Sequence, residues 1–174
     1  LAVLGYVDQG GRGIMQSAID TGAFETFVLG DGMIGDSLLD VSGLDAAKVI
    51  GTAPGSESDA AATFDDMAKE AGITGTGPYR GESYDAAALM ILAMQKAGAA
   101  DRGAIAENVM DIANAPGEQI GPGELDKALE MVAAGEDIDY QGATGVEFTD
   151  VGEALGSYKE LAIEDGAWKT VKVR

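Results

Sequence analysis

Hydrophobic and polar positions in residues 1–52 alternate between two spacings. Short apolar runs predict strands at residues 1–6, 27–29 and 46–52. Between the first two runs, Ile14, Met15, Ala18 and Ile19 recur at the spacing of one helix face. A second, shorter helix is expected around residues 37–39. This strand–helix–strand–helix–strand order predicts a parallel sheet with right-handed crossovers.

The pattern changes at residues 52–56, where Pro54 and Gly55 disfavour a continuing strand. The apolar spacing that follows predicts four helices, over residues 58–71, 82–94, 105–112 and 125–132. The second of these is apolar nearly all round and is therefore expected to be buried. Residues 116–123 and 140–145 are predicted to form loops, because Gly and Pro interrupt them.

The last part of the chain returns to strand-like patterns. A short strand is expected at residues 146–148, followed by two longer ones at residues 157–163 and 167–173. Asp165-Gly166 joins the longer pair, and Asp-Gly between two such runs is a strong hairpin signal.

Composition narrows the possible functions. The 174 residues suffice for one good core or for parts of two lobes. With 11 Lys and Arg against 30 Asp and Glu, the formal net charge is −19, which repels nucleic acid and anionic membranes. The charge favours a cationic or zwitterionic ligand, and it is equally typical of adaptation to a salty habitat.

Two residue types are missing altogether. The absence of Cys and His excludes thiol nucleophiles, Ser-His-Asp triads and nearly every zinc site. The longest apolar run, residues 86–94, is well short of the roughly 20 residues that span a membrane. The chain begins abruptly at Leu1 inside a predicted strand, so we expect a fragment whose N-terminal part is missing.

Two side chains follow neighbouring strands and are the candidate binding residues. Tyr6 ends the first predicted strand, and Asp31 lies in the tight turn Gly30-Asp31-Gly32 after the second. In open α/β sheets the ligand crevice lies outside these carboxyl ends. We predict that Tyr6 packs against a small ligand and that Asp31 holds its positive charge. The alternative is that Asp31 only stabilises its own turn.

Other motifs give weaker signals. The glycines of residues 10–13 lie between a strand and a helix, as in phosphate-binding loops. Their spacing fits neither G-x-G-x-x-G nor G-x-x-x-x-G-K-[ST] and favours a flexible turn. The three acids within residues 136–139 and Asp150 lack the spacing of an EF-hand and favour solvated surface charge. No pair of carboxylates stands out for acid–base catalysis, and no S-x-x-K sequence occurs.

Four stretches, taken in order, resemble the C-terminal half of periplasmic substrate-binding proteins of the leucine/isoleucine/valine type, which serve ABC importers. The stretches are residues 4–18, the Phe-Val-Leu-Gly-Asp-Gly of residues 27–32, the Gly-Glu-Ser-Tyr-Asp-Ala of residues 81–86 with the apolar helix after it, and residues 142–152. The spacing of the last stretch departs by about one residue from the commonest family form.

The resemblance implies an α/β fold of the type I periplasmic-binding-protein class, with two lobes, parallel sheets and helices on both faces, incomplete at the N-terminus. Residues 1–52 would be part of the second lobe, residues 53–156 the C-terminal half of the first, and residues 157–174 a return to the second. In amino-acid-binding relatives the acid of the turn holds the ligand's α-ammonium, which places that role on Asp31. The tyrosine of the same wall falls on Tyr6.

The resemblance also implies a function. The protein would be a non-enzymatic periplasmic receptor, made as a precursor with a signal peptide. It would act without a cofactor or metal, as a monomer, and would deliver an amino acid or similar solute to an ABC permease in the membrane. Two alternatives stay open: a ligand-sensing domain of a signalling receptor with the same fold, and an α/β enzyme that uses carboxylates.

Overall fold

The computed structural model describes residues 1–75, 77–114 and 116–174, and the chain forms two compact units. Unit 1 contains Leu1–Ser56, Gly75–Pro78 and Ser157–Arg174. Unit 2 contains Glu57–Thr74 and Tyr79–Gly156. Each unit has a hydrophobic core of its own.

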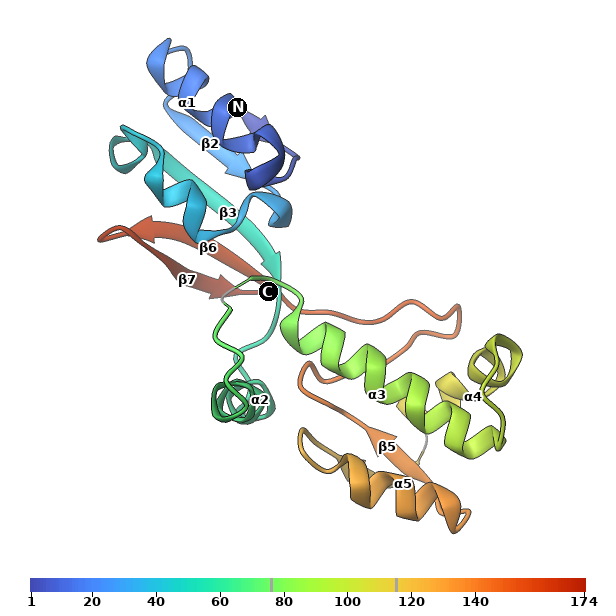
Figure 1. Cartoon of the computed structure of the whole chain (residues 1–174). Coiled ribbons are helices and arrows are strands. Elements are labelled where there is room, and N and C mark those ends of the chain that lie inside the picture. Colours follow the sequence, from blue (N-terminus) through green and yellow to red (C-terminus); the bar gives the residue numbers. More distant parts are fainter. Residues whose placement is uncertain (76, 115) are drawn as a thin grey trace. The chain divides into compact units, whose positions relative to one another are not determined.

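Unit 1 is built on a five-stranded sheet in the order β1-β2-β3-β6-β7 (Figure 1). Its strands are β1 (Ala2–Val3), β2 (Thr26–Leu29), β3 (Lys48–Pro54), β6 (Tyr158–Glu164) and β7 (Ala167–Val173). The first three are parallel, as their alternation with helices predicts, whereas β6 and β7 are antiparallel to their neighbours.

The C-terminal hairpin confirms the prediction from Asp165-Gly166. These two residues adopt φ values of 52° and 72°. A two-residue hairpin turn of type I′ requires positive φ at both positions, and Asp-Gly meets that requirement at low strain. The Trp168 side chain then packs against the core of unit 1, and its indole N–H donates to the Gly35 carbonyl at 3.2 Å.

Helical segments connect the parallel strands of unit 1. The predicted helix after the first strand is confirmed as α1 (Arg12–Asp20), and the short helix near residue 37 is confirmed as the 3-10 turn Asp36–Asp40. Three further turns are Val7–Gly11, Asp31–Met33 and Leu44–Ala46. The core collects apolar side chains of the sheet, of α1 and of these turns: Val3, Val7, Met15, Ala18, Phe27, Leu29, Met33, Leu38, Val41, Leu44 and Val49.

Unit 2 contains the four predicted helices. They are α2 (Asp59–Glu70), α3 (Arg80–Ala97), α4 (Arg102–Asn114) and α5 (Leu125–Ala133). The Ser58 hydroxyl caps α2 by accepting from the Ala61 amide at 3.1 Å. Among the described residues, no helix has both the length and the apolar character needed to cross a membrane.

Two short strands of unit 2 were missed by the sequence analysis. β4 (Glu118–Ile120) lies inside a predicted loop, and β5 (Ile138–Tyr140) begins inside the acidic run of residues 136–139. They pair in parallel with α5 as the crossover helix between them. Conversely, the strand expected at residues 146–148 is wrong, since only an isolated bridge joins Phe148 to Ala154.

The expectation that the second predicted helix is buried is confirmed for one face only. Ala88, Leu89 and Leu92 of α3 lie in the core of unit 2. On the same helix, Met90 and Ile91 keep 46% and 39% of their surface exposed. The helix therefore has one buried face, and its other face is apolar but solvent-exposed within the described part of the chain.

Candidate functional site

The carboxyl ends of β1 and β2 bring two loops of unit 1 together. Because the strands are parallel neighbours, Val3 and Leu29 lie side by side at the end of the pairing. The Gly30 amide then donates to the Val3 carbonyl at 3.2 Å, which extends the contact by one residue. The chain therefore places Tyr6 and Asp31 at one edge of the sheet.

Tyr6 is presented by a fixed backbone. Its carbonyl accepts from the amides of Gln9 at 3.1 Å and Gly11 at 3.0 Å, which closes the turn after β1. A β-carbon placed on Gly32 would lie 3.0 Å from Cδ1 of the Tyr6 ring, so the ring lies directly against the Gly32 backbone. With 66% of its surface exposed, Tyr6 still offers an aromatic face to a ligand.

Met33 ends the turn that begins at Asp31, and its side chain packs against the loop that follows Tyr6. It is fully buried in the core of unit 1. A β-carbon placed on Gly11 would lie 2.8 Å from Cε of Met33 and 2.7 Å from the Tyr6 carbonyl oxygen. The loop of Tyr6 and the turn of Asp31 thus share one packing contact, in which only glycine fits at position 11.

Asp31 begins the 3-10 turn Asp31–Met33 and is half-buried. Its Oδ1 accepts from the Gly32 amide at 2.9 Å, which is the local turn contact that the alternative interpretation predicts. Among the described residues, Oδ2 has no hydrogen-bond or ion-pair partner. A carboxylate has about four acceptor positions, so it can hold the turn and a ligand cation together.

Two further carboxylates lie close to this edge in the sequence. Asp8 follows Tyr6 by two residues and accepts from the Ser37 hydroxyl at 2.7 Å, which ties the first loop to the 3-10 turn Asp36–Asp40. Asp36 begins that turn. The loops that surround Tyr6 and Asp31 are therefore acidic, and this charge favours a cationic group on a ligand.

The glycine-rich segment of residues 10–13 forms a structural turn. The Gly11 amide, which a phosphate would need, already donates to the Tyr6 carbonyl. Gly10 has a φ of 102°, a conformation that suits glycine. The flexible-turn interpretation therefore fits the geometry better than a phosphate loop.

Unit 2 contains a buried polar centre that the sequence analysis missed. The Asp85 side chain, only 2% exposed, projects from α3 and is the one buried charged residue among those described. It accepts four hydrogen bonds: from the Tyr140 hydroxyl at 2.9 Å, the Ala143 amide at 2.8 Å, the Thr144 amide at 2.9 Å and the Thr144 hydroxyl at 2.7 Å. The carboxylate thereby fastens the loop after β5 to the first turns of α3.

The buried environment of Asp85 also changes the pKa of its hydrogen-bond partner Tyr140. Burial, reinforced by the adjacent Asp85 carboxylate, raises the pKa of the Tyr140 hydroxyl far above its ordinary value. Gly142, with a φ of 56°, passes so close to the carboxylate that a β-carbon would overlap it. Asp85 and Gly142 belong to two of the four stretches that carry the family resemblance, and this contact shows that the two stretches meet.

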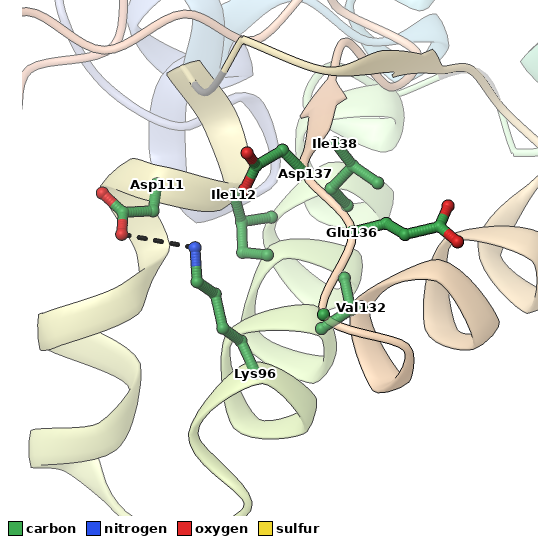
Figure 2. Close-up of a pocket in the computed structure, with 8 residues that line it drawn as sticks. Lys96, Asp111, Ile112, Val132, Glu136, Asp137 and Ile138 are labelled. Carbon is green, nitrogen blue, oxygen red and sulfur yellow. Dashed lines mark hydrogen bonds and ion pairs between the residues drawn. The ribbon is translucent and has the colours of Figure 1, made fainter.

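A small pocket lies elsewhere in unit 2, beside the end of α3 and the start of β5 (Figure 2). Its volume is about 130 Å³, and Lys96, Asp111, Glu136 and Asp137 supply its charged lining. Lys96 is already paired with Asp111 at 3.3 Å. Among the described residues no group of three or more acidic side chains could hold a metal ion. We therefore assign no ligand to this pocket.

Comparison with known proteins agrees with this architecture. The leucine-binding protein LivK of Thermotoga maritima matches 99% of the chain with a TM-score of 0.69 and 19% sequence identity. The chain therefore has the α/β fold of a periplasmic binding protein. It spans 43% of the length of LivK.

A curated relative has a function in signalling. The chain is 32% identical over 94 residues to the chemotactic signal transduction system substrate-binding protein BasB of Halobacterium salinarum. The match includes 53% of the chain and 23% of BasB. No family model matches the chain. Both similar proteins are binding proteins.

Proposed function

We propose that the chain belongs to an extracytoplasmic receptor that binds an amino acid, branched-chain or similar, and passes it to an ABC permease. The residues we assign to the ligand are Tyr6 and Asp31. Asp31 pairs with the α-ammonium group, and Tyr6 packs against the remainder of the solute. The receptor is a monomer of periplasmic location and carries out no catalysis.

The observation that supports this proposal best is Oδ2 of Asp31, which has no partner among the described residues and belongs to the turn against which the exposed Tyr6 ring lies. The Gly32 backbone lies against the Tyr6 ring and its amide donates to Oδ1 of Asp31, so Gly32 holds both side chains before a ligand arrives. Preorganisation of this kind lowers the entropy lost on binding. The fold shared with LivK and the similarity to BasB, a substrate-binding protein, support the same interpretation.

A second candidate function is signalling, because BasB belongs to a chemotactic signal transduction system. In that case the loaded receptor contacts a sensory partner in place of a permease. Deletion of the gene separates the two: loss of solute uptake supports transport, whereas loss of chemotaxis with normal uptake supports sensing.

Replacing one carboxylate oxygen of Asp31 with an amide nitrogen tests the site. In Asp31→Asn, the side-chain oxygen can still accept from the Gly32 amide, so the turn is retained while the charge is removed. Removing one partner of a buried ion pair costs about 3–5 kcal/mol, so affinity for an amino acid should fall by roughly 10²- to 5 × 10³-fold. Calorimetric titration of the full-length gene product measures this loss.

The matched control is Asp45→Asn, since Asp45 is an exposed acid of unit 1 outside this edge. A thermal-shift screen first finds the ligand, because a solute at a hundred times its Kd adds about 2.7 kcal/mol of stability. Unchanged affinity in Asp31→Asn would remove Asp31 from the site. Conversion of any bound solute into product would overturn the non-enzymatic assignment.

A further inference from the structure

The strand β7 forms one edge of the sheet in unit 1. It is seven residues long and pairs with β6 on one side only, and no other described strand covers its free side (Figure 1). In an antiparallel pair, alternate backbone N–H and C=O groups point away from the partner strand. The free side of β7 therefore presents a row of hydrogen-bonding groups that another strand could use.

The charge of this strand is opposite to that of the rest of the chain. Residues 167–174 contain Lys169, Lys172 and Arg174 and no acid. The other 166 residues hold the remaining eight Lys and Arg and all 30 Asp and Glu. Arg174 pairs with Glu160 of β6 at 2.7 Å. Lys169 and Lys172 are exposed, and neither forms an ion pair with a described residue.

Lysines on an edge strand commonly prevent two copies of a protein from pairing through their edges. The same lysines attract a strand of opposite charge, so they select between partners. Because the chain as a whole carries a formal charge of −19, an acidic partner is repelled over most of its surface. β7 is where such a partner meets a favourable charge.

An irregularity gives the edge an apolar contact point as well. The pairing runs Leu161 with Thr170 and Glu160 with Lys172, so Val171 is the extra residue of a β-bulge. Val171 is 57% exposed between the two lysines. The edge thus combines backbone hydrogen-bonding groups, two cations with no ion pair to a described residue, and one exposed apolar side chain.

We propose that β7 is a docking edge for an extended, carboxylate-rich segment of a partner protein, which adds to the sheet as a further strand. The backbone supplies affinity, Lys169 and Lys172 supply selectivity for acidic side chains, and Val171 contacts an apolar residue of the segment. This surface is separate from Tyr6 and Asp31, so it does not depend on the proposed solute site.

The experiment uses a fluorescein-labelled peptide of alternating Glu and Val, with an alternating Gln and Val peptide as the uncharged probe. Fluorescence anisotropy at low ionic strength measures its binding to the chain. We expect Lys169→Glu with Lys172→Glu to weaken binding at least about tenfold, because two attractive contacts become repulsive. Lys48→Glu with Lys69→Glu changes the net charge equally at two other exposed lysines and should leave the affinity unchanged.

Three controls keep the result interpretable. Hydrogen exchange must slow at β7 amides when the acidic peptide binds, because strand addition protects them. The milder pair Lys169→Gln with Lys172→Gln, checked for folding by Trp168 fluorescence, must weaken binding in the same direction. Equal losses in both charge-reversed variants, unprotected β7 amides, or preferential binding to anionic lipid vesicles would each overturn the proposal.

Discussion

Removing the Asp85 carboxylate should destabilise unit 2 strongly. Asp85→Ala takes away the acceptor of four hydrogen bonds, and two of the donors, the Tyr140 hydroxyl and the Ala143 amide, are buried with it. A hydrogen bond to a charged group contributes about 1.5–3 kcal/mol, but water that enters the vacated space recovers part of that loss. We therefore expect the free energy of unfolding to fall by about 2–6 kcal/mol, because each of these two buried donors left without an acceptor costs about 1–3 kcal/mol.

The chain provides separate probes for its two units. Its single tryptophan, Trp168, reports on unit 1, whereas α2 to α5, all in unit 2, dominate the far-UV circular dichroism. In urea, Asp85→Ala should lower the midpoint of the circular dichroism transition and leave the Trp168 fluorescence transition in place. The control Asp66→Ala removes an exposed acid of α2 and should change the free energy by less than about 0.5 kcal/mol.

Two results would refute this reasoning. A loss below about 1 kcal/mol in Asp85→Ala would mean that the four hydrogen bonds contribute little beyond what water offers. An equal shift of both transitions would mean that the effect is not confined to the unit that contains Asp85. Asp85→Asn refines the test, because its amide group must face at least one of the backbone N–H donors and should recover little of the lost stability.

Three further predictions concern stability alone. Tyr140→Phe should remove one hydrogen bond to Asp85, at about 1.5–3 kcal/mol. Because the pKa of Tyr140 is raised on folding, its contribution is complete below the ordinary tyrosine value of 10.0 and declines above it, so urea titrations above pH 10.0 should show less alkaline destabilisation in Tyr140→Phe than in the parent chain. Ser58→Ala should cost about 1 kcal/mol through loss of the α2 cap, measurable as a lower urea midpoint, and Ser58→Asp should retain the cap. Raising NaCl should increase the thermal midpoint by screening the repulsion among the 30 acidic side chains; a midpoint that falls with salt would show that ion pairs such as Arg80 with Asp65 outweigh that repulsion.

The sequence was informative wherever one local signal decided the structure. The periodicity of residues 14–19 predicts α1, and Asp165-Gly166 predicts the hairpin because its conformation depends on two residues alone. The three-residue strands β4 and β5 offered no such signal. Each contains polar residues, and their pairing depends on α5 placing them side by side.

The candidate sites show the same difference. Tyr6 and Asp31 could be placed at one edge because parallel strands end together, although their roles as ligand contacts stay predictions. The stretch of residues 81–86 that contains Asp85 could be recognised, but the buried role of Asp85 could not, since its donors follow it by 55 to 59 residues. Nor could the pattern of α3 show that Met90 and Ile91 face solvent, because an apolar helix does not reveal which of its faces is covered.

The position of β6 in the sheet has a consequence for synthesis on the ribosome. Pro54 at the end of β3 pairs with Tyr158, so all of unit 2 is translated between the two strands. At usual elongation rates this interval is on the order of ten seconds. Unit 2 can fold during that time, while the β3 edge stays uncovered and open to a nascent-chain chaperone or to a neighbouring polypeptide. The arrival of β6 then covers the β3 edge, and β7 pairs with β6 afterwards.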